Sequence, residues 1–189
     1  MRSFFFAAAS LCSLTTAFPN PFKILAPWDT MAPPPAGTQL YQLQTKSTTT
    51  TVSGQWLALA TGSTQYSLAT AQTAATKFFT NKYDATGTYA FHNADDTRQV
   101  ALQGTNGTLL YVVDVTNPSS GTIPAGQLLE WATFTTDSNV LGVKDGSTLT
   151  NRTFVAVQGT GNAYTVALYD GASNTTAKIT PITLNIVKV

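Results

Sequence analysis

The segment VALQGT at residues 100–105 returns almost unchanged as VAVQGT at residues 155–160, and a weaker copy, LALATG, stands at residues 57–62. Each copy is a short run rich in aliphatic residues that ends near a glycine, as a strand does when it enters a tight turn. Such self-similarity within one chain indicates a fold built from repeated units.

Further predicted strands surround each copy, separated by Gly, Asn, Asp and Ser clusters. One strand precedes each copy, at 41–45, 89–93 and 140–144, another follows at 66–69, 109–113 and 164–169, and a fourth is expected at 77–80, 131–135 and 182–187. Asp114 and Asp170 follow the third strand of the last two units. The chain thus predicts three units of four strands, near residues 40–84, 88–137 and 140–189. Only residues 68–77 are weakly helical in character.

Three consecutive four-strand units resemble the β-trefoil, in which such units close a short barrel that hairpins cap at one end. The expected fold class is therefore all-β, a β-trefoil-like barrel. A closed barrel removes exposed sheet edges, which matters for a chain of which only 10% is charged. A β-sandwich of two sheets with duplicated hairpins is the alternative.

Alternation along the second strand of each unit predicts which side chains enter the core. The residues expected to point inward are Leu57, Leu59, Val100, Leu102, Val155 and Val157, and those expected to point outward are Ala58, Ala101 and Ala156.

The first seventeen residues predict a secretory signal peptide, because Arg2 is followed by an apolar run at 4–14 and by small residues before Phe18. That run is shorter than the ~20 residues of a membrane-spanning helix. Cys12 lies inside the signal, so the mature chain has no cysteine, which excludes disulfides, thiol catalysis and cysteine-ligated zinc. We expect a secreted protein, located outside the cell or in the cell wall.

Three segments follow from this pattern. Residues 1–17 are the signal peptide. Residues 18–39 hold six of the nine prolines and predict a linker or propeptide. Residues 40–189 are expected to form a single all-β domain.

The charge of the chain limits its partners. The net charge of the 189 residues is +1, and 34 threonines leave an exterior made mostly of hydroxyl and amide groups. This charge argues against a nucleic-acid-binding surface, and no nucleic-acid or membrane partner is expected. The oligomeric state does not follow from the sequence.

The residues needed for catalysis are scarce. His92 is the only histidine, so a Ser-His-Asp triad would have to use it, and no nucleophile-elbow sequence accompanies it. Glu130 is the only glutamate, and with the adjoining Trp131 and an aspartate such as Asp137 it defines a glycosidase hypothesis. Phosphate-cradling glycine loops and calcium loops are absent from the sequence. We expect no enzyme activity, cofactor or metal.

Carbohydrate binding is the more serious functional alternative. A sugar site needs an aromatic face with nearby amide and carboxylate groups, which Trp56 with Gln55, or Trp131 with Glu130, would supply. The Q-x-W signature of ricin-type lectins is absent from all three units. A cysteine-free trefoil also resembles some fungal protease inhibitors, for which the loops 47–53 and 117–125 would be the contact regions.

Asn106, Asn151 and Asn174 match the N-glycosylation rule, whereas Pro118 spoils the site at Asn117. With a signal peptide, glycosylation at one or more of the three is expected, on surface loops.

Taken together, the signal, the proline-rich lead, the lack of mature cysteines and the threonine-rich exterior resemble small secreted, wall-associated proteins of ascomycete fungi, including conidial-surface antigens. This resemblance implies a non-enzymatic surface glycoprotein whose partners are wall polysaccharides or host surface molecules. Hydrophobins are excluded, because that family requires eight cysteines.

Overall fold

The computed structural model describes residues 34–105, 107–116, 123 and 126–189. The predicted signal peptide, residues 18–33 of the proline-rich segment, Asn106 and most of the loop 117–125 lie outside the described residues. The strands are β1 (Tyr41–Lys46), β2 (Trp56–Leu59), β3 (Tyr66–Ala69), β4 (Phe78–Tyr83), β5 (Thr88–Asn93), β6 (Gln99–Thr105), β7 (Leu109–Val115), β8 (Gln127–Glu130), β9 (Phe134–Thr135), β10 (Gly142–Val143), β11 (Thr153–Gln158), β12 (Tyr164–Tyr169), β13 (Ile179–Pro181) and β14 (Thr183–Lys188). Two short 3-10 turns, η1 (Gln72–Ala74) and η2 (Asp137–Asn139), are the only helical elements among the described residues.

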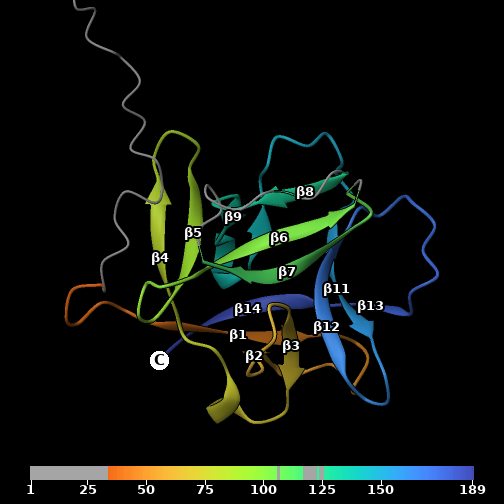
Figure 1. Cartoon of the computed structure of the whole chain (residues 1–189), viewed down its shortest axis with the longest axis horizontal. Coiled ribbons are helices and arrows are strands. Elements are labelled where there is room, and N and C mark those ends of the chain that lie inside the picture. The colour runs from red at the N-terminus through yellow and green to blue at the C-terminus, as the bar shows by residue number, and fades with distance from the viewer. Residues whose placement is uncertain (1–33, 106, 117–122, 124–125) are drawn as a thin grey trace, which may run out of the picture.

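The protein is all-β, as the sequence predicts. Eight strands pair in a closed antiparallel barrel, in the order β1–β2–β3–β12–β7–β6–β5–β4 and back to β1. The remaining strands add to this ring: β14 to β1, β9 to β5, β10 to β9, β8 to β6, β11 to β12, and β13 to β11. Figure 1 shows β6 and β7 lying above β1 and β14, with β11 and β12 at one side.

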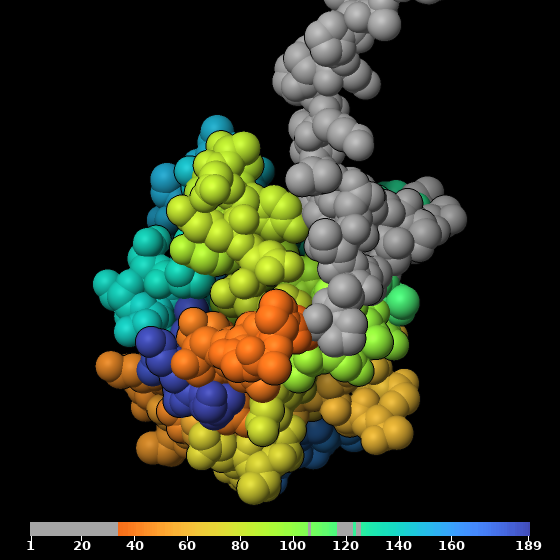
Figure 2. Space-filling view, turned by 90° about the vertical axis from the view of Figure 1, so that its left-hand side faces the viewer, coloured from red at the N-terminus to blue at the C-terminus, as the bar shows by residue number. Residues whose placement is uncertain are grey.

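The two ends of the described chain meet. β1 and β14 pair along their whole length, and the Val189 amide donates to the Leu40 carbonyl at 3.1 Å. Figure 2 shows the orange start and the blue end of the chain side by side on one face. This pairing covers an edge of β1 that would otherwise be open to other chains.

The observed strands lie close to the predicted ones. β3 and β12 coincide with the predictions at 66–69 and 164–169, and most others differ by one or two residues at an end. The clearest difference is at 131–135, where only Phe134–Thr135 forms a strand, and where Ala132 has a φ of 56°. Since this left-handed conformation cannot continue a strand, the backbone turns between β8 and β9. β8 and β13 were not predicted.

Aliphatic and aromatic side chains fill the interior of the barrel and form the main core. Tyr66, Phe78, Phe91 and Phe134 are its largest fully buried members, and their rings follow one another at centroid separations of 5.7, 6.3 and 5.7 Å. Such a chain of tilted and edge-on rings is a favourable aromatic packing.

The side chains predicted to point into the core from the second strand of each unit do so in the first two units. In the third unit the prediction is wrong. Leu57, Val100 and Leu102 belong to the main core, and Leu59 packs against it. In β11, however, Phe154 and Ala156 face the main core, while Val155 and Val157 form a separate small cluster with Ala167.

The register between β11 and β12 explains this difference. Ala156 pairs with Val166 and Phe154 with Leu168, so these residues share the inner face. A shift of one residue turns every side chain of a strand to the other side, and the near-identical VALQGT and VAVQGT segments differ by such a shift. Ala58 and Ala101 lie outside the main core but are buried all the same.

No helix among the described residues has the length and apolar character that crossing a membrane demands.

Candidate functional site

Trp56 and Gln55, the first predicted sugar-binding pair, stand at the start of β2. The Trp56 side chain is buried, with 8% of the residue exposed, and its backbone pairs with Gln44 and Ala69. An aromatic ring that stacks on a sugar needs an accessible face, which Trp56 does not present. Gln55 is half-buried and faces a groove.

That groove, called here the Tyr164 groove, has a volume of about 580 Å³. Its polar and aromatic lining comes from Thr51, Gln55, Thr70, Asn162 and Tyr164, and Leu68 adds an apolar wall. The ring of Tyr164 is half-buried and packs against the main core, so its position is fixed. Every described residue that lines the groove is uncharged.

Of the four residues predicted for sugar binding, Gln55 alone lines this groove, and Tyr164, its aromatic residue, was not among them. Tyr164 was recognised only as the first residue of a strand, because strand alternation does not reveal which outward side chains meet a distant loop. Residues 51–55 and 162–164 come together here through the pairing of β12 with β3.

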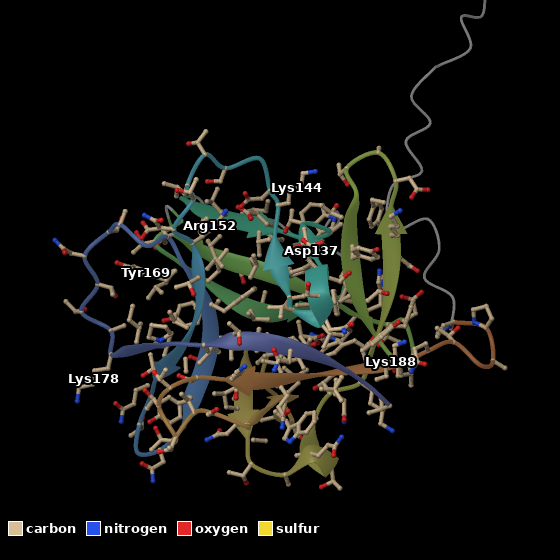
Figure 3. All side chains as sticks on the ribbon, turned by 180° about the vertical axis from the view of Figure 1, so that it is seen from behind. Asp137, Lys144, Arg152, Tyr169, Lys178 and Lys188 are labelled. Carbon is tan, nitrogen blue, oxygen red and sulfur yellow. The ribbon has the colours of Figure 1, made fainter. Side chains whose placement is uncertain are left out.

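Glu130 and Trp131, the second predicted pair, lie where β8 ends. Trp131 is half-buried. Glu130 sits beside Arg152, with a separation of 3.9 Å between Oε2 and Nη2, and beside Asp145. Arg152 also pairs through Nη1 with Oδ2 of Asp145. Arg152 comes immediately before β11 in the chain (Figure 3).

These charged groups have little contact with water. The exposed fractions of the side chains are 21% for Glu130, 10% for Asp145 and 11% for Arg152. Burial, together with the hydrogen bond and charge of Asp145, raises the pKa of Glu130 to about 7. Burial opposes the charge on Asp145 as well, but the hydrogen bond from Arg152 holds the pKa of Asp145 below its ordinary value.

Glu130 and Asp145 thus form a pair of carboxyl groups that share a proton, and the guanidinium of Arg152 lies on one side of this pair. The raised pKa of Glu130 means that this carboxyl keeps its proton up to a pH of about 7, whereas the lowered pKa of Asp145 keeps that carboxyl charged. Glycosidases hold their two carboxyl groups about 5 Å or more apart, on either side of the bond that breaks. Glu130 and Asp145 instead bond to each other, and Asp137 is exposed in η2.

His92 lies in β5 and is buried, with 3% of the residue exposed. Nδ1 is 2.8 Å from Oδ1 of Asp96, Nε2 is 3.5 Å from the amide of Asn81, and the imidazole stacks on Phe79 at 5.1 Å. Burial lowers the pKa of His92 although Asp96 opposes this. The structure thus places the histidine in the β4–β5 strand pair, away from solvent.

Two of the predicted glycosylation sites lie on the described chain. Asn151 and Asn174 are both exposed, in the loops before β11 and before β13. In the loop 47–53, one of the two predicted inhibitor loops, Ser47 donates to the Pro181 carbonyl at 2.8 Å and Val52 is fully buried. This loop is thus anchored at both ends.

Comparison with known proteins assigns no relative. No protein-family model, curated protein or solved structure matches this chain. Within the part of the chain that the structure describes, no three His, Cys, Asp or Glu side chains gather in a way that would hold a metal ion.

Proposed function

We propose that this protein is a secreted, non-enzymatic glycoprotein of a fungal cell wall or spore surface, and that it acts as a coat by binding neutral polysaccharide. The resemblance in composition suggests the location. The Tyr164 groove is the single observation that carries the binding role.

The chemistry of the groove fits an uncharged saccharide. Sugar hydroxyls need partners that both donate and accept hydrogen bonds, and the side chains of Gln55, Asn162 and the threonines do both. The apolar faces of sugar rings need an aromatic or aliphatic surface, which Tyr164 and Leu68 supply. A charged ligand would find no ionic partner among the described residues of the lining.

A non-enzymatic role is supported by the state of the catalytic candidates. Glu130 and Asp145 are tied to each other and to Arg152, and the His92 imidazole is enclosed by Phe79, Asn81 and Asp96. Glu130, Asp145 and His92 do not line the Tyr164 groove.

A pull-down of the mature protein on chitin, β-glucan and mannan tests the proposal. We expect saturable binding to at least one of them, lost in Tyr164→Ala and weakened in Asn162→Ala, whose side chain is exposed. Trp131→Ala is the comparison variant. Loss of binding in Trp131→Ala with full binding in Tyr164→Ala would move the site to Trp131 and Glu130, and the absence of binding to all three would refute the binding role.

Turnover assays on the same glycans test the non-enzymatic part. We expect no product from wild-type protein. Release of product that disappears in Glu130→Gln would make the protein a hydrolase and overturn the proposal.

We also propose that the barrel is a β-trefoil of three repeats. Three hairpins, β2–β3, β6–β7 and β11–β12, support this, because their second strands contact one another: β12 pairs with β3 and with β7, and Gln65 bridges to Val113. A ring of β1, β4, β5, β9, β10 and β14 supports it further. This ring is closed by the β-bridge between Val140 and Asn185 and by the 2.8 Å hydrogen bond from the Leu141 amide to the Leu184 carbonyl.

Hydrogen exchange at the Leu141 amide tests whether this ring is closed. A closed ring protects the Leu141 amide as strongly as the amides of β1. Rapid exchange at Leu141 with slow exchange in β1 would leave a barrel without the threefold closure.

A further inference from the structure

A second groove, called here the Tyr111 groove, lies against the hairpin of β6 and β7 and has a volume of about 490 Å³. Its polar and aromatic lining includes Gln65, Gln103, Thr108, Tyr111, Gln127 and Thr175. All described residues that line it are uncharged. Tyr111 packs against the small cluster that contains Val155, so the groove lies on the side of the strands that faces away from the main core.

The loop of residues 170–178 connects β12 to β13 and is held by its own hydrogen bonds. Oδ1 of Asp170 accepts a hydrogen bond of 2.9 Å from the Ser173 amide. The hydroxyl of Tyr169, which comes immediately before the loop (Figure 3), donates to the Ser173 carbonyl at 2.6 Å. Both bonds fix Ser173, which is the residue directly before Asn174.

The residues that follow Asn174 are fixed as well. Thr175 lines the groove, and its Oγ1 accepts a hydrogen bond of 3.1 Å from the Ala177 amide. Ala177 and Ile179 pack against the same small cluster as Tyr111. Asn174 itself is exposed. It therefore lies at the edge of the Tyr111 groove, on a stretch of backbone that is held on both sides.

The chemistry of the groove suits the glycan that Asn174 is predicted to carry. An N-linked glycan begins with N-acetylglucosamine, which is uncharged and presents hydroxyls, an acetamide and apolar ring faces. Gln103 donates from Nε2 to Oε1 of Gln127 at 3.1 Å, which orients both amides. Each amide keeps a free donor or lone pair for the sugar, and the Tyr111 ring offers an apolar surface.

We propose that the N-linked glycan on Asn174 packs into the Tyr111 groove and covers it. The inference rests on the proposed function, in which the protein is a secreted glycoprotein, and it adds the place where one glycan is held. A sugar that is covalently attached at the edge of the groove contacts it intramolecularly, so weak contacts are enough to hold it there.

The test compares two acceptor sites in the full chain secreted by a eukaryotic host. Intact mass establishes that each site is occupied, and thermal unfolding follows. We expect Asn174→Gln to lower the melting temperature by about 2–4 °C, because the glycan contacts are lost. Asn151→Gln is the matched control, since Asn151 is an exposed acceptor that does not line the groove, and it should leave the melting temperature unchanged.

Two further variants separate the glycan from the asparagine side chain. Thr176→Ala removes the acceptor sequence but keeps Asn174, and it should lower the melting temperature as much as Asn174→Gln does. In Tyr111→Ala, loss of the Asn174 glycan should have no further effect. Gln65→Ala, at an exposed residue of the lining, should reduce the effect of glycan loss without disturbing the core.

Other results would overturn the proposal. Equal masses of wild type and Asn174→Gln would mean that Asn174 carries no glycan. Equal melting temperatures of Asn174→Gln and Asn151→Gln would mean that the glycan extends into solvent. Thr108, which lines the groove, completes the acceptor sequence of Asn106, so a loss confined to Asn106→Gln would assign the groove to that other glycan.

Polysaccharide pull-down keeps this inference apart from the binding role of the Tyr164 groove. Asn174→Gln should still bind polysaccharide, because Asn174 does not line the Tyr164 groove. Failure of wild-type protein to bind any polysaccharide, together with a lower melting temperature in Asn174→Gln, would refute the binding role and support the packed glycan.

Discussion

The phenol of Tyr66 donates a hydrogen bond of 3.0 Å to Oδ1 of Asp114, and both residues are almost completely buried. Forty-eight positions separate them in the chain, and the bond joins β3 of one hairpin to β7 of the next. Arg98 pairs with the other oxygen of the same carboxylate. Burial raises the pKa of Asp114, against the hydrogen bond from Tyr66 and the charge of Arg98.

Tyr66→Phe should therefore destabilise the fold by about 2 kcal/mol, because a buried carboxylate loses a hydrogen-bond donor. Urea unfolding at neutral pH measures this. Tyr41→Phe, in a half-buried tyrosine of β1, is the control and should change the free energy of unfolding by less than about 0.5 kcal/mol. Equal effects of the two substitutions would mean that the Tyr66 bond contributes nothing.

Gly104 and Gly159, which occupy the same place in the two repeated segments, should differ in their tolerance of alanine. A Cβ on Gly104 would lie 2.1 Å from the Leu109 carbonyl oxygen, whereas a Cβ on Gly159 meets its nearest atom, the Ala163 carbonyl oxygen, at 3.5 Å. Gly104→Ala should lower stability by about 2 kcal/mol or more, since the β6–β7 hairpin must shift. Gly159→Ala should cost less than about 1 kcal/mol. Thermal unfolding of both variants decides this, and equal melting temperatures would refute the tight approach at Gly104.

The stability of the protein should depend on the protonation of Glu130. The pKa of Glu130 rises from the ordinary 4.5 to about 7 in the folded state. At a pH between these two values the folded chain therefore keeps a proton on Glu130 that the unfolded chain has lost. This contribution to stability is therefore lost as the pH rises from 4.5 to 7, and it amounts to at most about 3 kcal/mol. Below pH 4.5 both states are protonated and Glu130 adds no pH dependence.

Glu130→Gln should remove this component of the pH profile, because the amide imitates the protonated carboxyl. Denaturant unfolding of both proteins across this pH range gives the difference in slope. Asp137→Asn, in an exposed residue of η2, is the matched control and should keep the wild-type slope. Parallel profiles for wild type and Glu130→Gln would contradict the proton-sharing pair.

Arg152 should be essential for the stability of its cluster. Arg152→Met removes the guanidinium that pairs with Asp145 and should cost about 3 kcal/mol, because a poorly hydrated carboxylate remains. In Arg152→Met with Asp145→Asn, much of that loss should be recovered, and a double-mutant cycle gives the coupling. Additive losses would show that the two side chains act independently.

Asn151 and Asn174 should carry glycans when the full chain is secreted by a eukaryotic host. Each is exposed in a loop, so an oligosaccharide can attach without disturbing a strand. Asn151→Gln and Asn174→Gln should each lower the mass of the secreted protein by one glycan, as intact-mass spectrometry detects. A secreted wild type whose mass does not change on enzymatic deglycosylation would refute occupancy of both sites.

Part of this structure follows directly from local sequence. Tyr66–Ala69 and Tyr164–Tyr169 are strands at the predicted positions, because short runs of aromatic and aliphatic residues that follow a glycine-containing turn favour an extended backbone. The repeat of VALQGT and VAVQGT correctly marked two hairpins. It did not reveal that Val155 faces away from the main core, since the register is set by the partner strand.

The candidate site was less accessible to such reasoning. Gln55 was found through its neighbour Trp56, whose own side chain proved buried, and Tyr164 and Arg152 were not singled out. Nothing in the residues near Arg152 or Glu130 indicates that they meet. Their approach depends on the loop that places Asp145 between them.

The sequence by itself determined that the chain is all-β and where most of its strands lie, because strand formation depends on residues within a few positions of one another. It also determined the scarcity of charged and catalytic groups, which is a matter of composition. Only the tertiary structure decided which outward side chains share a groove and which carboxyl group gains a proton. Those properties depend on distance and desolvation among residues that are far apart in the chain, and pairing between strands brings these residues together.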